Sequence, residues 1–154
     1  MKLKDKMLNN LLVYLGGERT SEILVPNCFV GRYEMDILRQ RSSGHIYEYE
    51  IKTSKSDFKN DFKKGTKHSD ILEGKGVANR FFFVIPKGLL SLEEIPKHLG
   101  VVEYDVECNH FRIMRNAKML HKRTELSTYE LMRNLAVKLS FREFHWRNKR
   151  INKL

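Results

Sequence analysis

The sequence lacks the long apolar run that a membrane-spanning helix requires. Its 154 residues contain no stretch of about eighteen consecutive apolar residues. Residues 1–6 are basic, but neither a long apolar core nor a small-residue cleavage site follows them. Internal repeats, low-complexity segments and linkers that would divide the chain are also missing. We therefore expect one domain over residues 1–154, with no membrane segment and no secretory signal.

Cysteine is scarce, and histidine is not grouped. Cys28 and Cys108 lie far apart and form no CxxC pair. They fit a reducing compartment, and we expect them to be small buried residues rather than a disulfide or zinc ligands. The six histidines form no HxxxH pair, which argues against a structural zinc site.

Acidic residues are few relative to basic ones. The chain has 19 Asp and Glu against 29 Lys and Arg, which gives a net charge of +10. Such an excess favours a polyanionic partner, with nucleic acid first and an anionic membrane second. A soluble protein that is simply basic is the alternative. The hydrophobic content of 41% and charged content of 31% are typical of a globular domain.

Apolar periodicity and turn residues predict alternating helices and strands. Residues 81–85 are continuously apolar, which is typical of a central strand buried on both faces. The chain passes from the strand at 45–52 to the strand at 79–86 through a helix, so we expect an α/β fold with a mixed central β-sheet flanked by helices. The expected helices are residues 3–15, 54–72, 91–99 and one that begins at Ser127, and the expected strands are residues 22–30, 33–38, 45–52, 79–86, 101–106 and 111–114.

The strand at 45–52 carries the most informative pattern. Aromatic and β-branched residues alternate there with polar ones, so Glu50 and Lys52 point to the same face. The preceding strand carries Asp36 and is joined to this strand by a polar turn. Pairing the two strands places Asp36 beside Glu50. Carboxylates are preferred ligands of Mg²⁺, and a nearby lysine can orient or deprotonate a water, so the pattern indicates metal-dependent phosphodiester hydrolysis.

The Glu-x-Lys pattern alone is weak. An acid two residues before a lysine occurs four times in the chain, and only Glu50–Lys52 lies on a strand beside another acid-bearing strand. The plain alternative is a cross-strand salt bridge on a solvated face.

Further acids share the faces of the two favoured ligands. Glu34 shares a face with Asp36, and Glu48 shares a face with Glu50, so four carboxylates would repel one another unless a cation binds or some project into water. We expect Asp36 and Glu50 to be the ligands, with Glu34 and Glu48 solvent-facing or supporting. Glu22 is a further acid that could assist.

The segment after Lys52 supplies basic residues next to the expected site. Ser54 or Ser56 can cap the helix there, and Phe58 and Phe62 supply its buried face. His68 could assist the site or merely cap the helix. We expect phosphate contacts from the lysines on the exposed face, although such a face is often merely solvated. These lysines are Lys55, Lys59, Lys63, Lys64 and Lys67.

Other basic and aromatic residues leave alternatives open. Basic residues between 112 and 123 could extend a nucleic-acid surface. Tyr47, Tyr49, Phe58 and Phe62 are expected in the core rather than as stacking platforms for bases, and Trp146 could serve either role.

These residues resemble the PD-(D/E)XK nuclease superfamily, which has the restriction-endonuclease-like fold. The pattern is Asp36 followed by Glu50-Ile51-Lys52 on a strand–turn–strand arrangement. Residues 50–64, 79–86 and 94–102 are similar to MmcB-like DNA repair proteins and to small phage and bacterial nuclease-like proteins. The resemblance covers about residues 22–105, and residues 117–121 also look similar.

The resemblance implies Asp36 and Glu50 as metal ligands, Lys52 as the catalytic lysine, Mg²⁺ or Mn²⁺ as cofactor and DNA as substrate. The usual proline before the aspartate is replaced by Met35. Many superfamily members use a glutamate on the first helix. Residues 3–15 have none, so that role is empty or falls to Glu18 or Glu22.

The sequence thus predicts a metal-dependent deoxyribonuclease of DNA repair, recombination or phage DNA processing. It would lie in the cytoplasm of a bacterium or of a phage-infected cell, a placement that the resemblance implies. A catalytically inactive DNA-binding repair-accessory protein is the alternative, and an RNA-directed module is a third hypothesis. Cutting both strands of a duplex would need two sites, so a homodimer is compatible with the function.

Overall fold

The computed structural model describes residues 1–16, 22–30, 33–124, 132–133, 135–137 and 139–140. The chain divides into two compact units, Met1–Thr124 and Glu125–Leu154. In the second unit the described residues are helical. Most of the helix predicted from Ser127 lies outside the described residues, as does Trp146. One domain over residues 1–154 stays a prediction.

The unit Met1–Thr124 is built on a six-stranded sheet whose strand order follows the chain, from β1 to β6. The pairs β1–β2, β2–β3 and β5–β6 are antiparallel, whereas β3–β4 and β4–β5 are parallel. The predicted α/β fold with a mixed sheet flanked by helices is therefore confirmed. The strands are β1 Ile23–Val30, β2 Tyr33–Gln40, β3 Ile46–Ile51, β4 Arg80–Pro86, β5 Gly100–Asp105 and β6 His110–Arg115.

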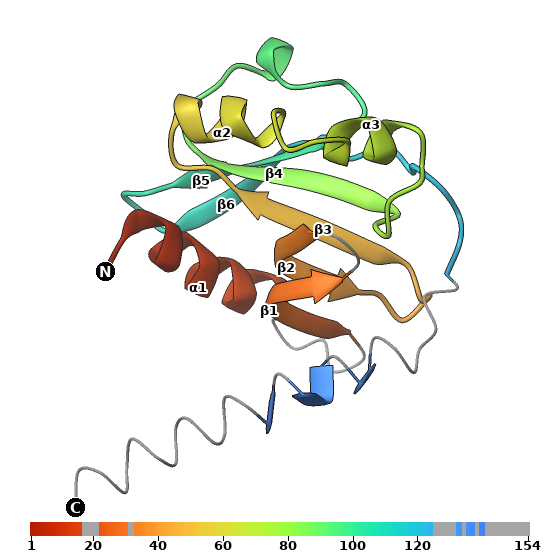
Figure 1. The fold of residues 1–154 in the computed structure, drawn as a ribbon. Coiled ribbons are helices and arrows are strands. Elements are labelled where there is room, and N and C mark those ends of the chain that lie inside the picture. The colour runs from red at the N-terminus through yellow and green to blue at the C-terminus, as the bar shows by residue number, and fades with distance from the viewer. Residues whose placement is uncertain (17–21, 31–32, 125–131, 134, 138, 141–154) are drawn as a thin grey trace, which may run out of the picture. The chain divides into compact units, whose positions relative to one another are not determined.

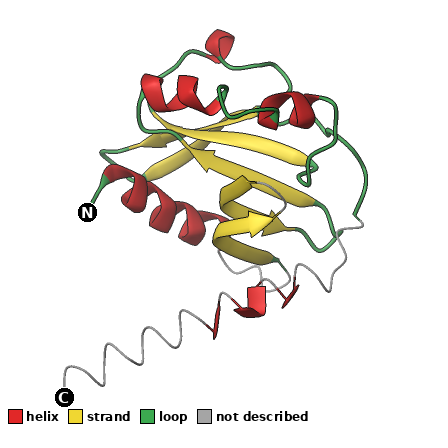
Figure 2. Cartoon of the chain, in the orientation of Figure 1, coloured by secondary structure: helices red, strands yellow, loops and turns green. Residues whose placement is uncertain are grey.

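Helices cover both faces of this sheet (Figures 1 and 2). The helix α1, Leu3–Gly16, lies on one face, and α2, Lys55–Asp61, and α3, Lys67–Leu72, lie on the other. A single turn of 3-10 helix, η1, covers Leu92–Glu94. No helix among the described residues is long and apolar enough to cross a membrane.

Two apolar cores hold these layers together, one on each face of the sheet. The first packs Met7, Leu11 and Leu15, which recur every fourth residue along α1, against the sheet. The second packs Phe58 of α2 and Ile71 of α3 against β4. Strand β4 contributes Phe82 and Val84 to the first core and Phe81, Phe83 and Ile85 to the second. Its continuous apolar run is thus explained by burial on both faces, as predicted.

The structure corrects three details of the sequence interpretation. The helix expected over residues 54–72 is two helices, because Gly65 takes a left-handed conformation with φ of +51° and breaks the run. The helix expected over residues 91–99 is one turn only, because Pro96 cannot continue it. Of the two cysteines expected to be buried, Cys28 is buried, but Cys108 is exposed in the turn between β5 and β6.

Gly100, at the start of β5, packs closely against Phe82 of β4 and against the backbone at Ala117. A Cβ at this position would overlap the ring of Phe82 and lie 2.8 Å from the backbone nitrogen of Ala117. We therefore expect Gly100→Ala to lower the free energy of unfolding by about 2 kcal/mol in urea denaturation. Gly76→Ala is the control, because the nearest atom to its Cβ is 3.7 Å away. Equal stability of the two variants would contradict this packing.

Candidate active site

Strand β3 and the residue that follows it present three ionisable side chains, Glu48, Glu50 and Lys52, to the layer of α2 and α3. The Lys52 side chain is only 2% exposed. Its Nζ lies 2.8 Å from Oε1 of Glu50 and 2.9 Å from Oδ1 of Asp61. Glu50 and Lys52 are thus neighbours on one face, as the alternation predicted. The solvated salt bridge considered as the alternative is excluded, because both side chains are buried.

Asp61, the last residue of α2, is the centre of this group. Its side chain is fully buried, and its carboxylate accepts hydrogen bonds from Lys52 and Lys67 and contacts Nε2 of His68 at 2.7 Å. Burial works to raise the pKa of Asp61, but the hydrogen bond with His68 and the charge of Lys67 hold this pKa well below its ordinary value. Asp61 is therefore ionised at neutral pH, and its contacts tie α2 and α3 to β3.

Lys67 occupies a different place from the one predicted. It was expected on the exposed face of a continuous helix, but its side chain is 3% exposed. Its Nζ lies 3.3 Å from Asp61, 3.5 Å from Glu50 and 3.9 Å from Glu48. Burial acts to lower the pKa of Lys67, but the charges of Glu50 and Glu48 raise this pKa above its ordinary value. The break at Gly65 starts a new helix and turns Lys67 inward.

Glu48 and Glu50 each carry a buried oxygen without a hydrogen bond. Oε1 of Glu48 and Oε2 of Glu50 have no hydrogen-bond partner among the described residues, and Nζ of Lys67 lies 3.9 Å from the first and 3.5 Å from the second. Burial raises the pKa of Glu48 to about 8, with Glu50 and Asp61 adding to the shift and Lys67 opposing it. Glu48 is therefore buried and not solvent-facing, whereas Glu34 is exposed.

Asp36 lies beside this group at the backbone of β3. Its Oδ2 accepts a hydrogen bond of 2.7 Å from the backbone nitrogen of Ile51, the residue between Glu50 and Lys52. Its Oδ1 lies 2.9 Å from Nζ of Lys4 on α1. The structure thus brings Asp36 to the end of the strand that carries Glu50 and Lys52, as the strand pairing predicted.

The remaining predicted residues divide into supporting positions and distant ones. Ser54 is the N-cap of α2, since its Oγ accepts a hydrogen bond from the backbone nitrogen of Asp57. His68 stacks on Phe62, with ring centroids 4.0 Å apart, in addition to contacting Asp61. Glu22 instead pairs with Arg39 of β2 and with Arg41 of the turn that follows β2. Glu18 lies outside the described residues. Four of the predicted phosphate-binding lysines are exposed, namely Lys55, Lys59, Lys63 and Lys64.

Sequence reasoning missed two residues of this group. Asp61 lies three residues after Phe58 on the inward side of α2, and that spacing could have identified it as buried. Lys4 had no comparable signal, because it depends on how α1 is placed against β2.

Comparisons with known proteins support the fold and leave the chemistry open. No family model matches the chain, and no curated protein matches it. The chain is similar to the SPO1766 protein of unknown function from Silicibacter pomeroyi, with a TM-score of 0.73 and 19% identity over 97% of this chain and 94% of that one. An XisH family protein from Nostoc punctiforme PCC 73102 aligns at a TM-score of 0.44 and 16% identity, over 68% of this chain and 96% of that one. The first likeness shows the fold alone.

The raised pKa of Glu48 predicts a pH-dependent cost to stability. Its ordinary pKa is 4.5, and its pKa in the folded chain is about 8. Between these values the folded state keeps a proton that the unfolded state loses, so the free energy of unfolding falls as the pH rises. Gln cannot ionise, so we expect Glu48→Gln to gain on the order of 2 kcal/mol over the wild type between pH 5 and pH 8.

Urea denaturation in EDTA at both pH values measures this gain. The matched control is Glu34→Gln, which removes an exposed carboxylate from the neighbouring strand and should leave the pH dependence unchanged. A Glu48→Gln protein whose stability followed the wild type at both pH values would contradict the burial argument.

Proposed function

We propose that this chain is a metal-dependent deoxyribonuclease that hydrolyses phosphodiester bonds. The observation that carries the proposal is the geometry at the end of β3. Glu50 and Lys52 are in contact there at 2.8 Å, and Asp36 is hydrogen-bonded to the backbone between them. Two carboxylates and an ammonium at one strand end are the groups that the resemblance assigns to this chemistry.

The donors fit a hard divalent cation. Asp36 and Glu50 offer only oxygen, and Oε2 of Glu50 is a buried acceptor without a hydrogen bond among the described residues. No group of three or more His, Cys, Asp or Glu side chains among those residues could hold a metal. Water would therefore complete the coordination shell, as is common for Mg²⁺. Bound Mg²⁺ or Mn²⁺ would polarise the scissile phosphate and lower the pKa of a coordinated water.

The protonation state of Lys52 favours one role for it. Burial acts to lower the pKa of Lys52, but the charge and hydrogen bond of Glu50, with those of Asp61, raise this pKa above its ordinary value. Lys52 therefore stays an ammonium at neutral pH and cannot remove a proton from water. It is suited to orient the attacking water by donating a hydrogen bond, or to stabilise the charge that develops on the phosphate.

The exposed lysines of α2 and of the turn after it would hold the DNA backbone. They include Lys55 beside Ser54, Lys59 within α2, and Lys63 and Lys64 in the turn. Contacts from ammonium groups to phosphates carry no sequence information, so we expect binding with strong salt dependence and little base preference. Lys67 takes no part in this surface, because it is buried.

A second function is favoured by one observation. Lys52 already contacts Glu50 and Asp61 and lies 3.8 Å from Asp57, and Asp36 already contacts Lys4. A site whose ammonium groups already have carboxylate partners within the chain also suits a DNA-binding repair-accessory protein without catalysis. The two functions differ in their need for Asp36 and Lys52.

Cleavage of labelled DNAs tests the nuclease proposal. Single-stranded, duplex, flap and four-way-junction DNA would be incubated with Mg²⁺ or Mn²⁺ and the wild type, Lys52→Ala or Asp36→Asn. We expect the wild type to cut at least one substrate and both variants to lose at least about 100-fold in rate. Lys97→Ala, at an exposed position after η1, is the control and should retain the rate. Circular dichroism checks that each variant is folded.

Failure would also be informative. If the folded wild type cut none of these DNAs while all four proteins bound DNA equally, the catalytic proposal would be wrong and the accessory function would stand.

The salt dependence of binding tests the lysine surface separately from catalysis. Lys59→Gln combined with Lys63→Gln should reduce the slope of log K against log salt by about 2, because each lysine neutralises about one phosphate. Fluorescence anisotropy of labelled duplex DNA between 50 and 200 mM NaCl, in EDTA, gives this slope. Lys97→Gln should leave it unchanged, and an unchanged slope in the double variant would place the DNA elsewhere.

A further inference from the structure

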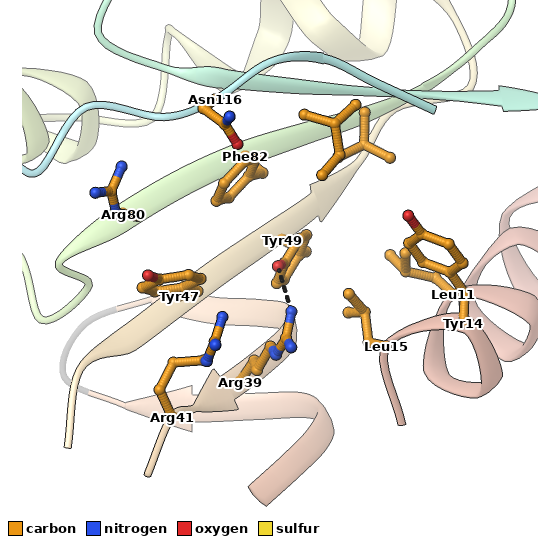
Figure 3. Close-up of a pocket in the computed structure, with 12 residues that line it drawn as sticks. Leu11, Tyr14, Leu15, Arg39, Arg41, Tyr47, Tyr49, Arg80, Phe82 and Asn116 are labelled. Carbon is orange, nitrogen blue, oxygen red and sulfur yellow. Dashed lines mark hydrogen bonds between the residues drawn. The ribbon is translucent and has the colours of Figure 1, made fainter. Parts of the chain in front are cut away.

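A second site lies on the opposite face of the sheet from Glu50 and Lys52. Tyr47 and Tyr49 alternate with the two glutamates along β3 and so face α1. There they line a cavity of about 740 Å³ (Figure 3), whose described lining residues all belong to the unit Met1–Thr124. Cavities of this size commonly hold small molecules. No motif or proposed function described above uses this cavity.

One end of the cavity is cationic. Arg39, Arg41 and Arg80 line it, and no Asp, Glu or Lys is among its described lining residues. Glu22 pairs with both Arg39 and Arg41, at 2.6 Å in each case. One carboxylate thus faces two guanidinium groups, and Arg80 adds a third positive charge. This surplus favours an anionic ligand.

Arg80 has a free hydrogen-bonding group at this end. Its Nη1 donates to the backbone oxygen of Ala117, but its Nε is buried and has no hydrogen-bond partner among the described residues. A buried donor left unpaired is costly. Arg80 and Arg41 flank the ring of Tyr47, with their guanidinium carbons 5.8 Å and 5.4 Å from its centroid. Their positions are therefore fixed around one aromatic ring.

The other end of the cavity is aromatic and apolar. Tyr14 and Ile113 line it with exposed side chains, 46% and 49% accessible. Figure 3 shows Tyr14 and Leu15 across the cavity from Arg41 and Arg80, with the carboxamide of Asn116 at its edge. An exposed ring is a stacking surface for a planar base, and a carboxamide can both donate to and accept from a base edge.

We propose that this cavity binds a nucleotide unit. Arg41 would hold its phosphate, with Arg80 adding positive charge on the other side of Tyr47, and its base would lie against Tyr14 and Ile113. A nucleotide has an anionic group that suits the arginines and a planar ring that suits Tyr14, and the volume of the cavity can hold both. A fatty acid would use the arginines but neither the ring of Tyr14 nor the carboxamide of Asn116. The inference does not depend on the proposed nuclease activity.

Two sources can supply such a unit, a free nucleotide or the phosphorylated end of a DNA strand. Isothermal titration calorimetry in EDTA separates them from each other and from simpler ligands. The probes are dAMP, deoxyadenosine, inorganic phosphate, decanoate, and a DNA hexanucleotide with either a 5′-phosphate or a 5′-hydroxyl. We expect dAMP to bind at least about tenfold more tightly than deoxyadenosine or phosphate alone, since only dAMP reaches both ends.

The hexanucleotides identify the source. Tighter binding of the 5′-phosphorylated strand than of the 5′-hydroxyl strand assigns the cavity to strand ends. Binding of dAMP with no difference between the strands assigns it to free nucleotides. Binding of decanoate without dAMP, or of no probe at all, would overturn the proposal.

Variants locate the binding. Arg41→Gln should weaken dAMP at least about tenfold, and Tyr14→Ala should weaken dAMP and deoxyadenosine but leave phosphate unchanged. Both positions are partly exposed, and thermal unfolding checks that each variant is folded. The matched control is Arg112→Gln, because Arg112 is exposed on β6 and points to the opposite side from Ile113. Equal affinity for dAMP in Arg41→Gln and Arg112→Gln would exclude this cavity as the site.

Discussion

The buried carboxylate of Asp61 holds the layer of α2 and α3 against β3. It receives Lys52 from the strand, and Lys67 and His68 from the helix that follows. Charges removed from water destabilise a fold unless they are paired and hydrogen-bonded, and an ammonium left without its carboxylate is more costly than one that stays solvated. Phe58 and Ile71 supply the apolar contacts between the layers. Asp61 supplies the negative charge that pairs with the two lysines buried between them.

The buried charges balance only if Glu48 is protonated. Glu48, Glu50 and Asp61 face two buried lysines, Lys52 and Lys67. With its pKa raised by burial to about 8, Glu48 is uncharged at neutral pH, and the remaining two carboxylates match the two ammonium groups. The buried side chains are therefore close to neutral together, and the exposed Lys64 also contacts Asp61, at 2.9 Å. Lys55, Lys59 and Lys63 are exposed outside this group.

The arrangement of the sheet could be predicted from the sequence, but the arrangement of the site could be predicted only in part. Alternation along residues 45–52 correctly placed Glu50 and Lys52 on one face, because side-chain direction in a strand depends only on position. The burial of Lys67 could not be predicted, since it depends on a helix break at Gly65. Likewise Tyr47 and Tyr49 were expected in the core, and nothing local indicates that they border a cavity. The cavity is lined by residues far apart in sequence, among them Arg41 and Arg80, which lie on either side of Tyr47.

The order of the strands has a consequence for how the chain is made. Each strand pairs with the one synthesised just before it, from β1 to β6, so the nascent sheet can grow at one edge as the ribosome releases the chain. The hairpins β1–β2–β3 and β5–β6 close over short turns, whereas the β3 edge must wait until α2, α3 and the whole of β4 have emerged. During that interval Glu50 and Lys52 are still in water. Their burial therefore requires the same segments that complete the apolar core around β4.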